Sequence, residues 1–239
     1  MVGISRDPEF LEAVKPVHPL DRFHLLLVKL LKQVLAVLKE IDLIRRAAGC
    51  PRAFWVVESV QQFAEEIRLG AKDWSQLPLA TIDFEEMYTN LAHDVIWSNV
   101  MSSVQEAFYY MATKLRVDPA NVRLGTSSWV SVASPDAAGS TSVSSEYTQE
   151  EVSFMLRHTL ATCVVVAGAE LLKQMKGLPM GIRPAPQLAN LTCYWVERGW
   201  VLNRLPAQGY VCRFIDDIFT AGYEIPAGVW HEVQGHFQQ

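Results

Sequence analysis

Two adjacent acids near the C-terminal end of the chain, Asp216 and Asp217, constrain its fold more than any other feature. They stand between two largely apolar runs, residues 211–215 and 218–220. This pattern predicts a β-hairpin whose tight turn carries the acids. Two charges at a hairpin tip favour a cation, and hard divalent ions such as Mg²⁺ prefer carboxylate oxygens. The same pattern also fits an ordinary solvated turn, so its meaning depends on the rest of the chain.

The composition is that of a folded globular protein with one large domain or two small ones. The 239 residues are 50% hydrophobic and 20% charged, and a chain of this length buries a substantial core. Four widely spaced cysteines without a CxxC or Cys/His cluster predict reduced, mostly buried thiols rather than a zinc site or a disulfide framework. No signal peptide or membrane-length apolar run is visible, which predicts an intracellular, soluble protein, with the nucleus as one candidate compartment.

The net charge argues against a nucleic-acid-binding protein. The chain carries −5 at pH 7, and its sequence pI is about 5.7, whereas nucleic-acid binders usually have a basic excess. The objection holds unless the positive charge is concentrated on one face or lies in a part of the protein outside this sequence.

Hydrophobic periodicity predicts a succession of helices. Apolar residues recur at three- and four-residue steps over residues 21–46, which indicates an amphipathic helix with its apolar side in the core. Further helices are expected at residues 60–69, stopped by Gly70, at residues 88–116, from a capping box at Thr148 to about residue 161, and at residues 187–198.

Strands and loops are expected between these helices. Residues 77–83 predict a short buried strand that ends in Asp83, and residues 163–174 predict a second hairpin with glycine at its turn. Small and polar residues dominate residues 117–147, which favours a flexible insertion. Two glycines and three prolines between residues 177 and 186 exclude a regular helix there.

Three features therefore stand in a fixed order along the chain. They are a strand that ends in Asp83, a loop rich in glycine and proline that enters a helix, and a hairpin with two acids. Nucleotidyl transfer by two metal ions requires such a set, because carboxylates from separate strands must converge to hold two cations roughly 3.5–4 Å apart. The sequence predicts the order of these features but not their convergence in space.

The same segments resemble the motifs of reverse transcriptases. Residues 83–90 (DFEEMYTN) look like motif A, residues 177–190 (GLPMGIRPAPQLAN) like motif B and residues 213–217 (RFIDD) like motif C, in the order of that family. The Tyr-Thr-Asn sequence after the first acid is most similar to the Penelope-like branch, which is related to telomerase reverse transcriptases. The resemblance covers roughly residues 54–222.

The resemblance implies an α+β fold, namely a right-hand polymerase palm with partial fingers, in which a small antiparallel sheet is backed by helices. That sheet would combine the strand that ends in Asp83 with both C-terminal hairpins. Residues 1–76 would form the partial fingers, a helical N-terminal region. Residues 77–239 would form the palm, with the flexible insertion at about residues 117–147.

The resemblance also implies roles for the acids. Asp83 and Asp216 would bind two Mg²⁺ ions, and Asp217 would assist them. One ion lowers the pKa of the primer 3′-hydroxyl, and the other neutralises the triphosphate of the incoming nucleotide. The same three acids are therefore the implied catalytic residues.

Four further residues would contact the nucleotide, namely Phe84, Tyr88, Met180 and Gly181. Tyr88 matches the aromatic gate whose ring excludes a ribose 2′-hydroxyl and so favours deoxynucleotides. By itself, Tyr88 also fits an aromatic residue packed at a helix entry. Gly181 matches the glycine that lets the backbone approach the nascent base pair, and Met180 stands where many relatives have Gln.

Two more residues would contact the primer or the template. Phe214 would pack beside the primer end. Arg183 fits either a contact to template phosphate or an exposed loop cation. Lys173 and Lys176 fit solvated side chains.

The sequence departs from the family pattern in several places. Ile182 stands where a small hydroxyl residue is usual, and Ala185 stands where Ser is expected. Only Lys15 and Arg22 are candidates for the basic fingers residues that contact the triphosphate. With 22 residues after Asp217, the primer grip is expected to be partial and the thumb absent.

Three hypotheses follow from the sequence. The first is a fragment of an RNA-directed DNA polymerase, a reverse transcriptase of the retroelement type or a telomerase-like one, with an RNA template, a DNA primer and dNTPs as partners. The second is a degenerate retroelement remnant that folds without polymerising. The third is a non-enzymatic helical binding module whose two acids form an ordinary turn.

Overall fold

The computed structural model describes most of the chain. It describes residues 19–74, 77–83, 87–132, 145–167, 170–179, 181–204 and 210–222. Phe84, Met180 and Lys15, which were assigned roles from the sequence, lie outside these residues.

Six α-helices carry most of the core in the described part of the chain. Their bounds are α2 Pro19–Ala47, α3 Val60–Trp74, α4 Met87–Asn90, α5 His93–Leu115, α6 Gln149–Ala161 and α7 Ala185–Arg204, and a short 3₁₀ helix, η1, spans Pro119–Asn121. Helix α2 confirms the amphipathic helix predicted over residues 21–46.

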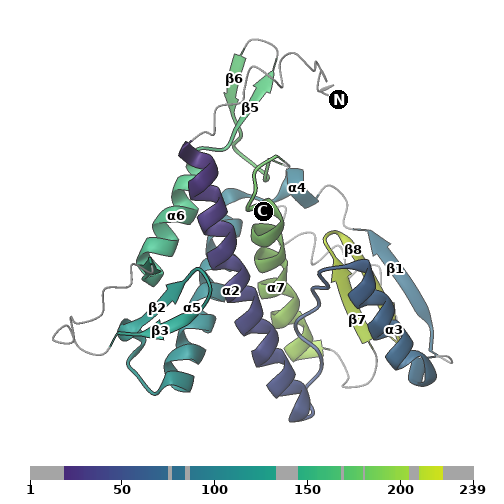
Figure 1. Cartoon of the computed structure of the whole chain (residues 1–239). Helices are drawn as coiled ribbons and strands as arrows, with labels where there is room; N and C mark the ends of the chain where they lie inside the picture. Colours follow the sequence, from purple (N-terminus) through teal and green to yellow (C-terminus); the bar gives the residue numbers. More distant parts are fainter. Residues whose placement is uncertain are drawn as a thin grey trace.

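Helices α2, α5, α6 and α7 form one helical layer. Helix α5 lies against α7, α2 and α6, and α2 also contacts α7 and α6. Figure 1 shows α2 running through the middle of the molecule, with α6 on one side and α7 on the other. Leu27 of α2, Val100 of α5 and Leu188 of α7 are fully buried in a single core. Residues from both sides of the predicted boundary at residue 76 thus share this core, and the division into two domains stays a prediction.

The described strands form three small antiparallel sheets. The first has the order β1–β8–β7, the second β3–β2–β4, and the third pairs β5 with β6. Their bounds are β1 Leu79–Asp83, β2 Val122–Gly125, β3 Trp129–Ser131, β4 Glu146–Tyr147, β5 Val164–Ala167, β6 Glu170–Lys173, β7 Tyr210–Phe214 and β8 Asp217–Ala221. The fold is therefore α+β with small antiparallel sheets and helices, as predicted.

The β1–β8–β7 sheet is packed on both faces. On one face, the rings of Tyr210 and Phe219 lie against each other, and Phe63 of α3 meets Phe219 edge to face with ring centroids 5.4 Å apart. On the other face, Val211 and Ile218 are buried in the main core. The sheet is thus held between α3 and the helical layer, as the ribbon in Figure 1 shows.

The outer edge of β7 is covered by the segment that precedes α3. The Arg213 N–H donates to the Trp55 carbonyl at 2.7 Å, and the Val57 N–H donates to the Arg213 carbonyl at 2.9 Å. This segment forms a parallel bridge with β7. Buried Trp55 and Val57 therefore close one edge of the sheet.

Two predicted helix ends differ from the structure. The helix predicted to stop at Gly70 continues to Trp74, because a single glycine inside a helix costs only about 1 kcal/mol relative to alanine. The helix predicted over residues 88–116 is split, since α4 ends at Asn90 and α5 begins at His93. At the junction, two backbone carbonyls accept hydrogen bonds from the glycine- and proline-rich loop instead of continuing the helical pattern.

The strand predictions need two corrections. β1 is an outer strand that is largely exposed rather than buried, and Leu79 is 63% exposed. The hairpin predicted over residues 163–174 is present as β5–β6, but it forms its own two-stranded sheet and does not pair with β1. Figure 1 shows this hairpin projecting beyond the end of α6, away from the β1–β8–β7 sheet.

Part of the predicted flexible insertion is ordered. Residues 122–131 form β2 and β3, and β4 pairs with β2. Val122 and Leu124 are buried, and Trp129 packs edge to face on Phe108 of α5 with ring centroids 4.9 Å apart. Three large apolar side chains are thus enough to anchor this segment on the helical layer. Residues 133–144 of the predicted insertion lie outside the described residues.

Other local predictions are confirmed. The Thr148 hydroxyl accepts a hydrogen bond from the Glu151 N–H, and the Glu151 carboxylate accepts one from the Thr148 N–H, which is the predicted capping box. The four cysteines are free, and all but Cys50 are buried. In the part of the chain that the structure describes, no helix has the length and apolar character needed to cross a bilayer.

Candidate active site

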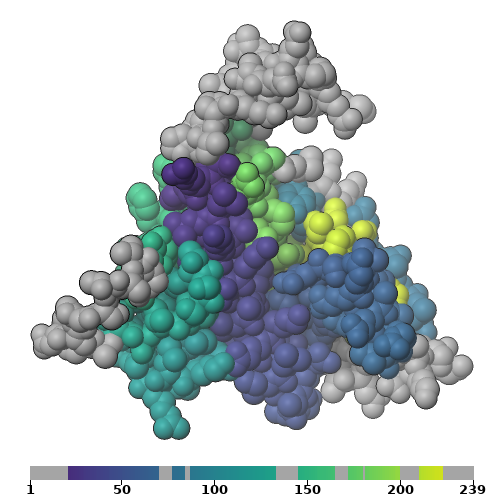
Figure 2. Space-filling model, in the orientation of Figure 1, coloured from purple at the N-terminus to yellow at the C-terminus, as the bar shows by residue number. Residues whose placement is uncertain are grey.

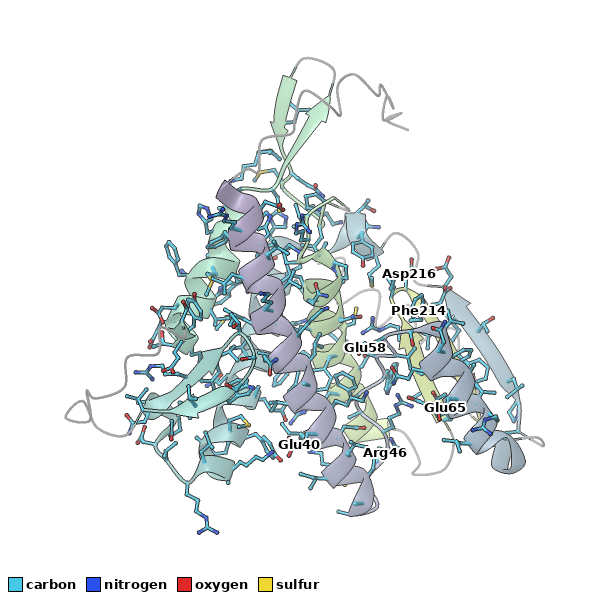
Figure 3. The ribbon with its side chains drawn as sticks, in the orientation of Figure 1. Glu40, Arg46, Glu58, Glu65, Phe214 and Asp216 are labelled. Carbon is cyan, nitrogen blue, oxygen red and sulfur yellow. The ribbon has the colours of Figure 1, made fainter. Side chains whose placement is uncertain are left out.

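The hairpin with the two acids ends in a two-residue turn. β7 and β8 pair from Tyr210 with Ala221 up to Phe214 with Asp217, which leaves Ile215 and Asp216 as the turn. Figure 3 shows Asp216 at the tip of the hairpin, beyond Phe214. Ile215 has a φ of 59°, a left-handed conformation that a β-branched residue adopts only when its surroundings hold it there.

The third acid comes from the neighbouring strand. The register of β1 and β8 places Asp83 directly opposite Asp217, and such cross-strand partners share one face with Cβ atoms roughly 4.5–5.5 Å apart. Asp216 lies one residue further, at the tip, and is half-buried, whereas Asp83 and Asp217 are exposed. All three acids thus lie at the same end of the sheet, and the direct register partner of Asp83 is Asp217.

No ion pair within the described residues neutralises the negative charge at this end of the sheet. None of Asp83, Asp216 and Asp217 belongs to a salt bridge there. Like charges directly opposite each other destabilise a sheet, and a bound cation removes that repulsion.

The acids suit a magnesium ion that arrives with phosphate ligands. Mg²⁺ prefers oxygen ligands and usually takes one or two protein carboxylates together with substrate phosphates and water. Over the described ranges, no three His, Cys, Asp or Glu side chains are grouped so as to hold a metal ion by themselves. Carboxylate oxygens are the ligand type that Mg²⁺ prefers, and two of these acids would provide the one or two protein ligands that it usually takes.

A buried arginine fastens the turn to α7. The Arg213 side chain is 0% exposed. Its Nε donates to Glu197 Oε1 at 2.5 Å, and its Nη1 donates to Asn190 Oδ1 at 2.9 Å and to the Ile215 carbonyl at 2.6 Å. We call Arg213, Glu197 and Asn190 the arginine clamp. The clamp binds the carbonyl of the residue with positive φ, and so it holds the conformation that places Asp216 at the tip.

The arginine of the clamp stays charged in the protein interior. Burial acts to lower the pKa of the Arg213 guanidinium, but Glu197 and the hydrogen bonds outweigh it and raise that pKa. A buried charge of this kind is tolerated only when it is paired and hydrogen-bonded. The clamp therefore neutralises Arg213 within the core and leaves little of its charge for the acids at the tip.

Tyr88 lies close to the tip of the hairpin. Its side chain is half-buried and packs against the main core. Burial raises the pKa of the Tyr88 hydroxyl, the negative charge of Asp216 raises it further, and Arg213 opposes both effects. Tyr88, which follows Asp83 by five positions, is therefore within electrostatic reach of the acid at the turn.

The glycine- and proline-rich loop is fastened to the segment that carries Tyr88. The Leu178 N–H donates to the Tyr88 carbonyl, and the Gly177 N–H donates to the Leu91 carbonyl, both at 2.6 Å. The ring Nε2 of His93 lies 2.8 Å from the Gly177 carbonyl oxygen. These contacts place the first and second motif segments side by side.

Gly177 is the glycine that this contact requires. Its φ is 82°, and an added Cβ would lie 2.5 Å from the Tyr88 carbonyl oxygen and 2.7 Å from that of Thr89. No side chain fits between the two backbones at that separation. Gly181, in contrast, is exposed, and an added Cβ would meet no atom within 4 Å.

The other residues assigned from the sequence take up varied positions. Phe214 is half-buried in the cluster beneath α3. Arg183 is exposed and forms an ion pair with Asp21 at the start of α2, so its charge is already matched. Lys173 and Lys176 are exposed, as predicted.

Sequence reasoning assigned no role to four residues that shape the site, namely His93, Asn190, Glu197 and Arg213. Arg213 lies in a strand of otherwise apolar residues, and a cation in such a place needs an acid partner. That signal predicts a partner but does not identify Glu197, which lies 16 positions away on another element. His93 gave no signal, because its partner is a backbone carbonyl.

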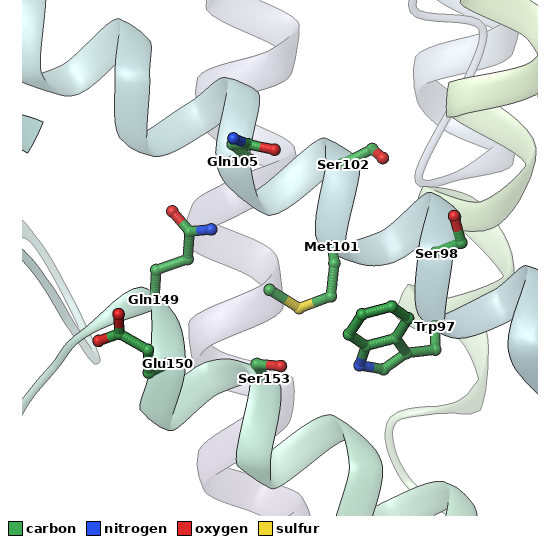
Figure 4. A pocket seen from close by; sticks show the side chains of 8 residues that line it. All are labelled: Trp97, Ser98, Met101, Ser102, Gln105, Gln149, Glu150 and Ser153. Atoms are coloured by element: carbon green, nitrogen blue, oxygen red, sulfur yellow. The ribbon is translucent and has the colours of Figure 1, made fainter.

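A pocket lies elsewhere on the surface, between α5 and α6. Its volume is about 340 Å³. Figure 4 shows that Trp97 and Met101 form its apolar wall and that serine and glutamine side chains line most of the remainder. None of the residues that line it belongs to the β1–β8–β7 sheet. The pocket is therefore separate from the site with the acids.

Comparison with solved structures places this arrangement in a known fold. Telomerase from Candida tropicalis, in complex with a TWJ fragment of telomeric RNA, matches with a TM-score of 0.60 and 14% identity over 89% of this chain and 31% of that chain. Telomerase from Candida albicans, also with a TWJ fragment of telomeric RNA, matches with a TM-score of 0.51 and 15% identity over 88% and 32% of the two chains. The fold resembles that of telomerase.

The likeness extends to the structure of apo telomerase from Candida tropicalis, with a TM-score of 0.56 and 12% identity. At such identities the likeness shows the fold alone, and the chain spans only about a third of the length of these telomerase chains. No protein-family model matches the chain, and no curated protein matches it.

Proposed function

We propose that the chain is a reverse-transcriptase fragment, the palm and partial fingers of an RNA-directed DNA polymerase. The observation that carries the proposal is the register that sets Asp83 beside the Asp216–Asp217 hairpin in a fold like that of telomerase. The contacts that join Tyr88 and Gly177 next to this hairpin support it. The partners proposed are an RNA template, a DNA primer and dNTPs.

Each part of the site has a task in this proposal. Asp83, Asp216 and Asp217 hold the metal ions, and the arginine clamp keeps the turn in place. When bound, Mg²⁺ would activate the primer 3′-hydroxyl and neutralise the nucleotide triphosphate. The Tyr88 ring borders the space beside Asp216 and limits which sugar fits there. Gly181, with open space on its Cβ side, lets a base pair approach the backbone.

Primer extension tests the proposal. We expect the chain to extend a DNA primer on an RNA template with dNTPs and Mg²⁺, and Asp216→Asn to slow extension by about 100-fold or more, since a metal ligand is lost. Asp118→Asn is the matched control, because it removes the same charge from an exposed acid that caps η1. If the folded chain does not extend the primer, the proposal is wrong and the degenerate remnant is favoured. If Asp216→Asn retains extension, the assignment of Asp216 as a metal ligand is wrong.

A second test concerns the sugar. We expect Tyr88→Ala to raise the incorporation of ribonucleotides relative to deoxynucleotides by about tenfold or more, because removal of the ring makes room for the 2′-hydroxyl. Tyr88→Phe keeps the ring and is expected to keep the discrimination. Competition between dNTP and rNTP in single-nucleotide extension measures the ratio. An unchanged preference in Tyr88→Ala would refute the gate assignment.

A further inference from the structure

The outward side of α2 carries a continuous row of exposed residues. They recur every three or four positions along the helix, as residues on one side of an α-helix do. Among them five are cations and none is an acid. The row consists of Arg22, Leu25, Lys29, Lys32, Ala36, Lys39, Leu43 and Arg46. We call it the basic stripe. In Figure 2 the purple surface of α2 is visible along the middle of the molecule from end to end, and Figure 3 labels Arg46 at its far end.

The stripe keeps its positive charge because the acids of α2 are engaged elsewhere. Asp21 pairs with Arg183, and Glu40 accepts hydrogen bonds from Lys114 and Tyr110. Asp42 is buried and accepts hydrogen bonds from two backbone N–H groups. None of the five cations of the stripe forms an ion pair with any residue that the structure describes. Their charge is therefore available to a partner.

Charged residues on the surface of a helix are usually just solvated, but the charge of this stripe is opposite in sign to the net charge of the chain. The chain as a whole carries −5, so five unmatched cations in one row represent a strong separation of charge. Such a row concentrates positive potential on one face. It also meets the condition under which an acidic chain binds nucleic acid, namely that its positive charge is gathered on one face.

We propose that the basic stripe binds the phosphate backbone of a nucleic acid, outside the site with the acids. From Arg22 to Arg46 it extends about 36 Å at 1.5 Å per residue, over which a duplex presents about 20 phosphate charges. Lys and Arg side chains along a helix neutralise such a backbone without reading sequence. The stripe starts at the residue next to Asp21, which pairs with Arg183 of the loop that enters α7. A bound strand therefore runs from that loop along the whole helix.

An acidic membrane fits the stripe less well. A helix that binds a lipid surface inserts an apolar face between the headgroups. The apolar face of α2 is already in the protein core, where Leu27, Leu30 and Leu31 are fully buried. The exposed large apolar side chains of α2 are Leu25 and Leu43 within the stripe and Ile44 beside it, too few to form an inserting apolar face.

The inference deepens the proposed function by adding a second contact surface for its nucleic acid, and it rests on that function only for the class of partner. The test is binding of a fluorescein-labelled RNA–DNA hybrid of 20 base pairs, followed by anisotropy across a range of salt concentrations without Mg²⁺. The variant carries Lys29→Gln, Lys32→Gln and Lys39→Gln. The matched control carries Arg68→Gln, Arg116→Gln and Lys173→Gln, which removes the same charge from exposed positions scattered outside α2.

We expect the stripe variant to bind the hybrid about tenfold or more weakly. The slope of the logarithm of its binding constant against the logarithm of the salt concentration should become shallower by about three, since each phosphate contact contributes about one. The dispersed control is expected to change the slope by less than one unit. Equal losses in the two variants, or no binding by the wild-type chain, would overturn the proposal. So would binding to phosphatidylserine vesicles that depends on the stripe while binding to the hybrid does not.

Asp216→Asn separates this inference from the proposed function. We expect the three stripe substitutions to weaken hybrid binding by the same factor in the Asp216→Asn background as in the wild-type chain, because the stripe lies on another element. If the wild-type chain does not extend a primer but still binds the hybrid through the stripe, only the catalytic proposal is refuted. If the wild-type chain extends a primer and the stripe variant binds and extends normally, only the proposal that the basic stripe binds nucleic acid is refuted.

Discussion

Replacing Arg213 with methionine is expected to lower the free energy of unfolding by about 3–5 kcal/mol, the usual cost of leaving one partner of a buried ion pair alone. The change strands Glu197, which is 5% exposed, and it leaves the Ile215 carbonyl and Asn190 without their donor. Urea denaturation followed by circular dichroism measures the loss. In a protein with a total stability of about 5–15 kcal/mol, such a loss is severe.

Two companion variants make this prediction specific. Arg198→Met is the matched control, because Arg198 follows Glu197 on the same helix and its partner Glu106 retains Arg45; its loss is expected to be clearly smaller. The double variant Arg213→Met with Glu197→Leu is expected to recover part of the stability, because apolar replacement of a whole buried pair is often neutral. If Arg213→Met and Arg198→Met lower the free energy of unfolding equally, the arginine clamp contributes no more to stability than the ion pair of Arg198.

The substitution Gly177→Ala is expected to destabilise the protein by about 2–5 kcal/mol. A side chain at positive φ costs about 1–2 kcal/mol, and overpacking adds about 1–3 kcal/mol. The new Cβ would lie 2.5 Å from the Tyr88 carbonyl oxygen, so the loop must separate from the segment that carries Tyr88. Thermal or urea unfolding measures the stability, and the fluorescence of the tryptophans reports the packing.

Gly181→Ala provides the contrast. Its Cβ meets open space, so its stability is expected to stay within about 0.5 kcal/mol of the wild-type value. Under the proposed function, the methyl group nevertheless faces the nascent base pair, and extension is expected to slow. If Gly177→Ala proves as stable as Gly181→Ala, the inference that a side chain at Gly177 clashes with the segment that carries Tyr88 is wrong.

Local sequence signals predicted the elements that depend on local chemistry. Alternating apolar residues around two acids predicted the β7–β8 hairpin, and the Thr148 and Glu151 spacing predicted the start of α6. The glycine- and proline-rich loop was predicted as non-helical because proline and glycine act within one or two residues of themselves. These signals need no knowledge of the fold.

The parts that depend on distant partners were not predictable in the same way. The register that pairs Asp83 with Asp217 joins strands more than 130 positions apart, and no local pattern sets it. The partner of Arg213 is on a helix whose rotation is set by packing. The break between α4 and α5 likewise comes from hydrogen bonds to a loop far along the chain, which override the helical periodicity of the sequence.

Helix α7 connects the glycine- and proline-rich loop with the hairpin that carries the acids. It begins at Ala185, directly after the glycine- and proline-rich loop, and it carries Asn190 and Glu197, which grip the hairpin through Arg213. A helix has a fixed rise per residue, so α7 sets the distance between its first residues, next to the loop, and the two side chains that hold the hairpin. The spacing between the loop and the acids is therefore set by one helix.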